Sequence, residues 1–228
     1  MNMDKEKLSN YIKEESKIIK RVKIVDLKKE VNIIVFLDSA YTDNKIISCF
    51  LFFDFINKKL IKKKSLISKI EFPYIPTYLS LREGPNYIKG LKDEKYDLII
   101  VDGQGIAHPR KMGIATYLGV KLNKPSIGVA KKILYGRYEP CEKIKGNYSK
   151  ILDNENNLIG YTLITKDNVK PIFISPGNLI SFKDTLNIIV SLIGKYRIPE
   201  PLREVHIYSK KIKSSLNENI YNRWSKSW

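Results

Sequence analysis

The segment spanning residues 96–130 constrains the fold of this chain more than any other. It begins with the apolar run YDLIIVD (96–102), continues through a glycine-rich turn and a helical pattern near 112–122, and ends with the apolar run PSIGVA (125–130). A strand, a helix and a second strand in this order make a βαβ unit, in which both strands lie parallel in one sheet. The sequence therefore predicts an α/β protein.

Three apolar runs upstream of this unit predict an antiparallel meander. VNIIVFLD (31–38) is continuous and ends in an acid, which is typical of a central strand, and IISCFLFFDFI (46–56) and KLIKKKSLI (59–67) follow it. Asn57 and Lys58 suit the tight turn between the last two runs. Downstream, IGYTLIT and PIFIS predict a hairpin. We therefore expect a mixed sheet in which a three-strand antiparallel meander joins parallel strands.

Amphipathic helical patterns flank the predicted strands, because apolar residues recur there every three to four positions. The clearest start signal is Ser181 followed by Asp184, a pair that caps the first turn of a helix. The other helices expected cover residues 4–22, residues 77–91 and a last segment that starts after Pro199 and Pro201 and runs into a basic, tryptophan-containing tail. The sequence has no repeats, linker or low-complexity block, so all 228 residues are predicted to form one domain.

The charge balance indicates a polyanionic partner. The chain has 41 lysine and arginine residues and 24 acidic ones, which gives a net charge of +17. Nucleic acid is the first partner to consider and an anionic membrane the second, although a lysine-rich genome bias also contributes to such an excess. The apolar runs are too short for a membrane span and two cysteines are too few for a disulfide framework. We therefore expect a soluble cytoplasmic protein that binds nucleic acid and no membrane.

Two acids, Asp38 and Asp102, close apolar strands in this interpretation. Ligands of α/β sheets bind at the carboxyl ends of the strands, and two carboxylates that meet there repel each other unless a cation lies between them. Hard oxygen ligands of this kind suit Mg²⁺ or Mn²⁺. Gly103 and Gly105, just after the second acid, leave room for a nucleic-acid backbone. The alternative is that each aspartate caps a helix or starts a turn.

Three other polar residues have an ordinary structural interpretation when each is taken alone. Glu83 lies beside Arg82 near the end of a predicted helix, where an acid is usually solvated. His206 has apolar neighbours on the predicted last helix, which is typical of a partly buried core histidine. His108 precedes a proline and suits a loop-stabilising hydrogen bond. None of the three indicates a catalytic site without further information.

Several ordered blocks spread over most of the chain carry more information together. They are FLDSAY (36–41), PYIPTYLSLREGP (73–85), VDGQGIAHPRKMGIATYLGV (101–120), KPSIGVAKKILYG (124–136), PIFISPGNLIS (171–181) and RIPEPLREVH (197–206). In this order they resemble endonuclease V, a family of hypoxanthine-directed repair nucleases, and the combination of DGQGIAHPR with KPSIGVAKK is the most specific part of the match. The resemblance implies a ribonuclease H-like mixed sheet flanked by helices.

The resemblance also implies a catalytic centre. Asp38 and Asp102 match the two metal-binding aspartates of the family, and Glu83 matches a third acid at the same metal site. His206 matches a fourth member, which is histidine in some relatives and an acid in others. Lys131, the first lysine of GVAKK, matches a lysine placed against the scissile phosphate. The implied cofactor is Mg²⁺, which Mn²⁺ can replace.

Further residues are implied in lesion recognition. The block PYIP matches a wedge that separates the two strands at the lesion, although by itself it is typical of a rigid turn with an exposed tyrosine. Thr77 follows at a position where the family usually has glycine, so its Cβ would tighten the base pocket. The wedge residues are Pro73, Tyr74, Ile75 and Pro76, and the residues implied for the base pocket and its flanking phosphates are Gly103, His108, Gly113 and Ile114.

The function implied by the resemblance is that of a Mg²⁺-dependent DNA-repair endonuclease. It would flip deoxyinosine out of the duplex and hydrolyse the second phosphodiester on the 3′ side, leaving a 3′-hydroxyl and a 5′-phosphate. Inosine-containing RNA and single-stranded DNA are alternative substrates, and a monomer is expected. Two other functions stay open: another ribonuclease H-like nuclease, which would share the acids but need neither wedge nor pocket, and a non-catalytic nucleic-acid binder that keeps only the fold.

Overall fold

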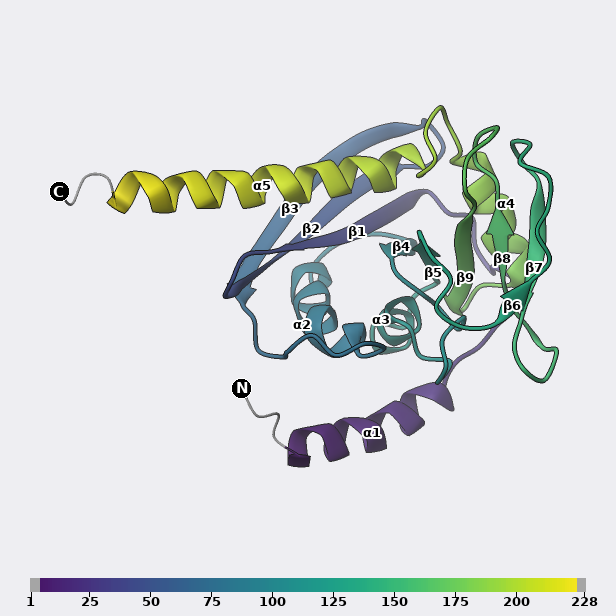
Figure 1. Ribbon diagram of the computed structural model, residues 1–228, viewed down its shortest axis with the longest axis horizontal. Coiled ribbons are helices and arrows are strands. Elements are labelled where there is room, and N and C mark those ends of the chain that lie inside the picture. The colour runs from purple at the N-terminus through teal and green to yellow at the C-terminus, as the bar shows by residue number, and fades with distance from the viewer. Residues whose placement is uncertain (1–4, 225–228) are drawn as a thin grey trace.

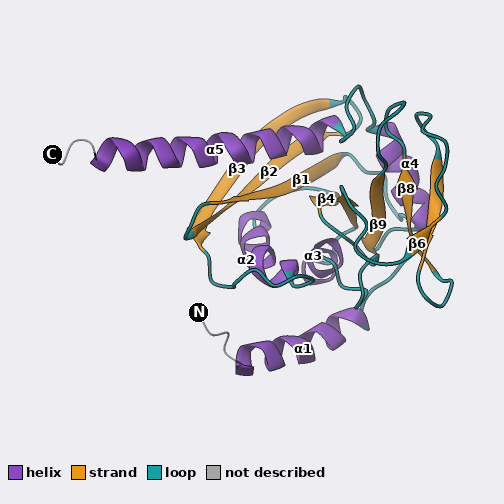
Figure 2. Cartoon of the chain, viewed as in Figure 1, coloured by secondary structure: helices purple, strands orange, loops and turns teal. Residues whose placement is uncertain are grey.

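The computed structural model describes the backbone of residues 5–224 and the side chains of residues 11–216. Leu8 of the predicted first helix and the tryptophans of the predicted tail lie outside the described side chains. Figure 1 and Figure 2 show how the helices and strands are arranged. They are α1 (Lys5–Ile19), β1 (Ile33–Tyr41), β2 (Lys45–Asp54), β3 (Lys59–Lys69), α2 (Leu79–Leu91), β4 (Leu98–Asp102), α3 (Ile114–Leu122), β5 (Ser126–Ala130), β6 (Arg137–Tyr138), β7 (Tyr148–Leu152), β8 (Leu158–Leu163), β9 (Ile172–Asn178), α4 (Phe182–Ser191) and α5 (Glu200–Trp224).

The described strands form one mixed sheet with the order β3-β2-β1-β4-β5-β9-β8-β7-β6. The antiparallel meander predicted from the sequence is confirmed by the pairing of β1 with β2 and of β2 with β3. The predicted βαβ unit is confirmed by the parallel pairing of β4 with β5, and β8 pairs with β9 as the expected antiparallel hairpin. β1 also pairs in parallel with β4, which joins the meander to the parallel strands.

Helices pack on both faces of this sheet. Successive residues of a strand contact different helices, because their side chains point to opposite sides. Along β1, Ile34 and Phe36 pack with residues of α4 and α5, whereas Val35 and Leu37 pack with residues of α2 and α3. α5 crosses the meander on one face and extends beyond it, and α1 lies outside α2 and α3 on the other (Figure 1). The sheet thus separates two apolar cores, and each face receives side chains from different helices.

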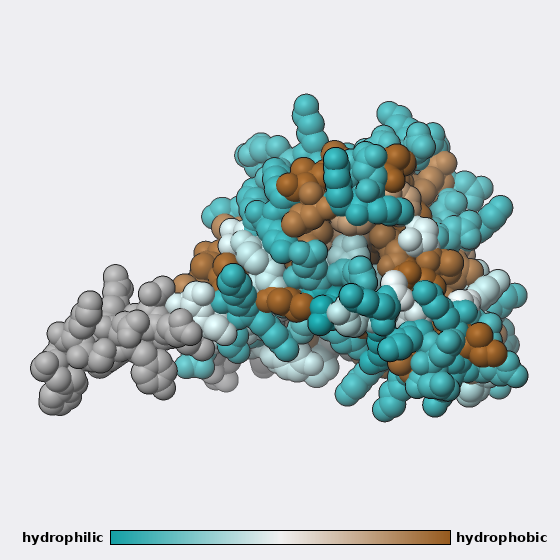
Figure 3. Space-filling model, turned by 90° about the horizontal axis from the view of Figure 1, so that it is seen from above, coloured by the Kyte–Doolittle hydropathy of each residue, from teal (hydrophilic) through white to brown (hydrophobic). Residues whose placement is uncertain are grey.

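The surface on the α5 side is mainly hydrophilic, with apolar side chains in several separate groups (Figure 3). On β3, Lys63 reaches this surface and forms an ion pair with Glu204 on α5 over 2.7 Å. Its neighbours Lys62 and Lys64 point to the other face, where both form ion pairs with Glu94 just after α2. Among residues 5–224, no helix combines the length and the hydrophobicity that a bilayer span requires.

Three details of the structure differ from the sequence predictions. β1 does not end at Asp38 but continues to Tyr41, because β2 pairs with it as far as Tyr41 opposite Ile46. α5 begins at Glu200, before Pro201 rather than after it, since proline in the first turn of a helix needs no N–H partner. The edge strand β6 and its neighbour β7 escape the sequence analysis because they are short, partly exposed and rich in polar residues, so no apolar run marks them.

The loop that leaves β4 lies directly on the backbone of β5 and β9. A Cβ added to Gly128 on β5 would come within 2.4 Å of the Gly105 nitrogen and 2.5 Å of the Gln104 carbonyl carbon. A Cβ added to Gly105 would come within 2.2 Å of the Pro176 carbonyl oxygen. Only residues without a side chain allow such close approach, so these two glycines hold the loop against the sheet.

We expect the substitution Gly128→Ala to lower the free energy of unfolding by about 1–3 kcal/mol, because the added methyl group meets backbone atoms that cannot move aside. Urea or thermal unfolding measures the change. Gly194→Ala is the matched control, since the nearest atoms that its Cβ would meet belong to the flexible side chain of Glu200. A loss at Gly128 no larger than that at Gly194 would contradict the close packing of the loop.

Candidate active site

The parallel register of β1 and β4 brings two acids side by side. Leu37 lies opposite Val101, so Asp38 and Asp102 occupy the next position along their strands. Both side chains point to the α5 face of the sheet, as that of Phe36 does, because alternate residues share a face. Asp38 is buried in the middle of β1, and β4 ends at Asp102. Two carboxylates that are distant in the sequence therefore meet where β4 stops.

The helix α5 completes this cluster. His206 Nδ1 lies 2.9 Å from Asp38 Oδ2, and the hydroxyl of Ser209, one turn later on the helix, donates a hydrogen bond of 2.9 Å to the same oxygen. One ligand atom from each of Asp38, Asp102 and His206 lies within 4.8 Å of the other two. Two carboxylates and an imidazole at this spacing are a donor set that could hold a divalent metal ion.

Lys131 provides positive charge beside the two acids. It follows β5 directly, and its ammonium group donates a hydrogen bond to Asp102 Oδ2. Burial raises the pKa of the Asp102 carboxyl, the neighbouring charge of Asp38 adds to this rise, and the Lys131 ammonium opposes it. The lysine therefore favours the ionised form of a carboxylate that its buried position would otherwise protonate more easily.

Glu83 approaches the site from the opposite face of the sheet. It lies on α2 with 6% of its surface exposed, so its interpretation as a solvated residue near the end of a helix is wrong. Its carboxylate accepts hydrogen bonds from Tyr41 and, over 3.0 Å, from Tyr87. Burial raises the pKa of Glu83 to about 7, the charges of Asp38 and Asp102 add to the rise, and the two tyrosine hydroxyls oppose it. Among the described residues, the group of mutually close ligand atoms contains His206 and not Glu83.

The loop between β3 and α2 carries the predicted wedge to a small cavity. Tyr74 is 72% exposed, and together with Ile75 it lines a cavity of about 180 Å³. Pro73 and Pro76 flank these two residues in the loop. The other lining residues are Thr77, Leu79, Ser80, Gln104, His108, Met112, Gly113, Ile114 and Leu134. The segment predicted as a wedge and the loop that leaves β4 thus share one cavity.

Three of the residues predicted for the base pocket line this cavity, namely His108, Gly113 and Ile114. Gly113 caps the N-terminus of α3 and Ile114 is the first residue of that helix. Gly103 lies behind them, since a Cβ there would come within 2.6 Å of the Ile114 side chain. His108 is buried, which lowers its pKa to about 4, and its Nε2 lies 3.0 Å from the carbonyl oxygen of Thr77. It stabilises the loop and lines the cavity at the same time.

Several residues around the two acids escape the sequence analysis. Ser209 lies three positions after His206, and Tyr87 lies four positions after Glu83, so each pair shares one face of its helix. Tyr41 is the last residue of the block FLDSAY, three positions after Asp38. Helical spacing and block membership were therefore the signals that could have found these hydroxyl donors.

Comparison with known proteins identifies the family and the fold. The Endonuclease V family model matches residues 16–207. The chain is 41% identical over 203 residues to endonuclease V of Thermosipho melanesiensis, covering 88% of this chain and 89% of the relative. The structure of endonuclease V from Bacillus subtilis matches with a TM-score of 0.86 at 28% identity and covers 96% of both chains. Endonuclease V of Ciona intestinalis, solved in complex with a 24mer DNA containing an inosine followed by a ribo-adenosine, matches with a TM-score of 0.81 at 24% identity, covering 92% of this chain and 99% of that one.

The family model thus spans most of the chain, and a curated relative retains substantial identity over nearly its whole length. The fold is that of solved endonuclease V structures, and it brings Asp38, Asp102 and His206 together. On these grounds the chain belongs to the endonuclease V family and is a nuclease.

Proposed function

We propose that this nuclease extrudes deoxyinosine from DNA and hydrolyses the second phosphodiester on the 3′ side of the lesion, leaving a 3′-hydroxyl and a 5′-phosphate. One observation carries the proposal: a single loop joins a metal-compatible cluster to a cavity with an exposed aromatic residue at its edge. Asp102 ends β4 in the cluster, and His108 of the loop that follows lines the cavity beside Tyr74. Chemistry and base recognition are therefore adjacent.

Asp38, Asp102 and His206 would hold a divalent cation, with Mg²⁺ the natural ion and Mn²⁺ a substitute. When bound, such an ion polarises the phosphate and makes its coordinated water more acidic. Glu83, with a pKa of about 7, exchanges a proton near neutral pH and is the residue we assign to orienting the attacking water. Asp38 is pre-oriented for its role by His206 and by the hydroxyl of α5 that bonds the same oxygen.

Lys131 is the residue we assign to the phosphate itself. Its ammonium group already lies on Asp102, so a phosphate that approaches this carboxylate comes within reach of the lysine. A cation fixed at that place offsets the negative charge that develops on the phosphate oxygens in the transition state. Its contribution is therefore to the rate of cleavage more than to the affinity for the lesion.

Recognition rests on the cost of unstacking a base. Extruding a base costs about a few kcal/mol, and this cost is lower for hypoxanthine than for a normal base because hypoxanthine pairs weakly. Tyr74 would fill the gap left in the stack, and such stacking contributes about 1–3 kcal/mol per base. A pocket formed by the loops around His108 and Thr77 accepts hypoxanthine and excludes guanine, whose 2-amino group would lie unpaired or in a clash.

The relative from Ciona intestinalis supports the choice of substrate, because it was solved with inosine-containing DNA and shares this fold. The +17 net charge of the present chain is also suited to a nucleic-acid partner. We propose inosine in DNA as the main substrate, with inosine RNA and single-stranded DNA as alternatives. Side-by-side cleavage assays on deoxyinosine DNA and inosine RNA of the same sequence decide between them.

The main test of the proposed chemistry is the substitution of Asp38→Asn and Asp102→Asn. Each is expected to lower Mg²⁺-dependent nicking of an inosine duplex more than about 100-fold, because a ligand of the metal is lost, while binding of the duplex remains. Chelation with EDTA is expected to stop the reaction of the unsubstituted protein, and added Mg²⁺ to restore it.

Asp43→Asn is the matched control, since it removes a carboxylate from an exposed turn that lies outside the cluster. It is expected to nick at the rate of the unsubstituted protein. If both Asp38→Asn and Asp102→Asn retain full nicking, the assignment of the metal site is wrong. If neither the unsubstituted protein nor any variant nicks DNA although all bind it, the chain is a nucleic-acid binder without catalysis.

The specificity of the reaction separates this proposal from that of a general ribonuclease H-like nuclease. The duplex that contains inosine is compared with the same duplex that contains adenine at that position. We expect cleavage of the first and little of the second. Equal rates on both would favour the general nuclease, because such an enzyme needs no base pocket.

Tyr74→Ala is expected to weaken binding of the inosine duplex by about 1–3 kcal/mol, since the exposed ring no longer stacks in the gap. The single-turnover rate of cleavage of bound substrate is expected to change less than the affinity does. Tyr148→Ala on the strand β7 removes another exposed tyrosine and serves as the control. Unchanged affinity of Tyr74→Ala for inosine DNA would rule out the wedge.

A further inference from the structure

Thr77, which directly follows the predicted wedge, has a backbone conformation that its side chain disfavours. Its φ angle is 69°, in the left-handed region. A β-branched residue rarely adopts this region, because its Cβ crowds the neighbouring backbone, whereas glycine adopts it readily. Such a conformation persists only where the surrounding structure holds it.

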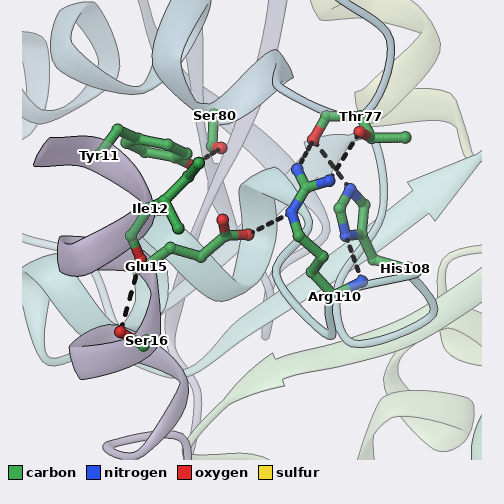
Figure 4. Close-up of polar contacts among 8 residues, drawn as sticks. All are labelled: Tyr11, Ile12, Glu15, Ser16, Thr77, Ser80, His108 and Arg110. Carbon is green, nitrogen blue, oxygen red and sulfur yellow. Dashed lines mark hydrogen bonds and ion pairs between the residues drawn. The ribbon is translucent and has the colours of Figure 1, made fainter. Parts of the chain in front are cut away.

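Arg110 makes most of the hydrogen bonds that keep Thr77 in this conformation (Figure 4). Its guanidinium group donates hydrogen bonds to the Thr77 carbonyl oxygen over 2.8 Å and to the Thr77 hydroxyl over 3.0 Å. His108 contributes a third contact: its Nδ1 accepts a hydrogen bond from the Arg110 backbone N–H, so its Nε2 carries the proton that is donated to the Thr77 carbonyl oxygen. Both the backbone and the side chain of Thr77 are thus held from one side.

Arg110 is itself anchored to the N-terminal helix α1. Its Nε donates a hydrogen bond of 2.7 Å to the buried carboxylate of Glu15, and its guanidinium group lies 4.0 Å from the centre of the Tyr78 ring. A second bond ties α1 to the same region, since the hydroxyls of Tyr11 and Ser80 lie 2.6 Å apart (Figure 4). A planar guanidinium group that is held on three sides cannot shift without breaking several of these contacts.

These contacts converge on the cavity that the proposed function assigns to the flipped base. Thr77, Ser80 and His108 line it, and Tyr74, three positions before Thr77, is the exposed ring at its edge. The direction in which the wedge leaves the cavity therefore depends on the backbone angles at Thr77. Glu15 and Arg110 do not line the cavity, so they act on it only through the residues that they hold.

We propose that Arg110, anchored by Glu15 of α1, is a positioning residue that holds Thr77 in its left-handed conformation and thereby fixes the wedge relative to the base cavity. The N-terminal helix then takes part in lesion recognition, although it lies on the far side of α2 and α3 from the metal-compatible cluster. This inference rests on the proposed recognition of inosine. It predicts that the preference for inosine no longer depends on Arg110 when residue 77 is one, such as glycine, that adopts the left-handed conformation readily.

A double-mutant cycle tests this dependence. The preference for inosine is measured as the ratio of the Kd for a duplex with adenine to the Kd for the same duplex with inosine, without Mg²⁺ so that the DNA stays intact. We expect Arg110→Ala to lower this preference at least about fivefold. In the Thr77→Gly background, the same Arg110→Ala change is expected to lower it less than about twofold, because glycine takes up the required φ freely.

Two conservative variants sharpen the cycle. Arg110→Lys keeps the positive charge but lacks the planar fork, so it is expected to lose the preference as Arg110→Ala does. Glu15→Gln weakens the anchor and is expected to lower the preference in the Thr77 background but not in the Thr77→Gly background. Lys111→Asn is the charge control, since it removes one positive charge at the next residue and asparagine tolerates the left-handed φ of 53° found there. It is expected to keep the full preference.

The outcomes separate this inference from the proposed function. If the unsubstituted protein shows no preference for inosine, the proposed function fails and this role fails with it. If the preference is present but Arg110→Ala lowers it equally in both backgrounds, only the positioning role is overturned, because Arg110 then acts directly on the nucleic acid. Thermal unfolding of every variant shows whether it is folded. If Arg110→Ala is unfolded, the same double-mutant cycle is measured with Arg110→Lys and with Glu15→Gln in its place.

Discussion

The parallel register of β1 with β4 is the constraint on which the site depends. Leu37 opposite Val101 places Asp38 beside Asp102, and the alternation of side chains turns both toward α5. A slip of one residue on either strand would turn its acid into the apolar core beneath α2 and α3. Both strands are buried on their two faces, so the packing of their apolar residues fixes this register strongly and the pairing of the acids follows from it.

The like charges of Asp38 and Asp102 are tolerated in a partly buried site because other elements supply groups that form hydrogen bonds with them. Lys131, directly after β5, bonds Asp102, while His206 and Ser209 of α5 bond Asp38. Buried carboxylates without such partners would be strongly destabilising. The groups that compensate the acids also surround the place where a cation and a phosphate would bind. The same groups that stabilise the two carboxylates in the folded state therefore pre-organise the site for its chemistry.

The two faces of the sheet contribute different parts of the machinery. The α5 face holds the metal-compatible cluster, while the α2 face brings Glu83, the wedge and the cavity. The loop that leaves β4 connects the two, and it lies so close to β5 and β9 that only glycine fits at Gly105 and Gly128. On the outer side of this loop, Arg110 links α1 to the left-handed Thr77. A lesion bound in the cavity would therefore lie against a rigid framework and not a free loop.

Local patterns in the sequence determined the meander, the βαβ unit and the helix that Ser181 caps, because periodicity and capping depend on neighbouring residues. They also marked Asp38 and Asp102 as strand acids, although β1 runs on past the first. The family resemblance assigned His206 and Glu83 to the site of the two acids, but the local patterns did not. Only the tertiary structure decided that His206 contacts Asp38 across 168 residues while Glu83 approaches from the other face, and that Glu15 reaches Arg110 across 95 residues. Such contacts depend on sheet register and on the faces that packed helices present to one another, and neither leaves a periodic trace in a single sequence.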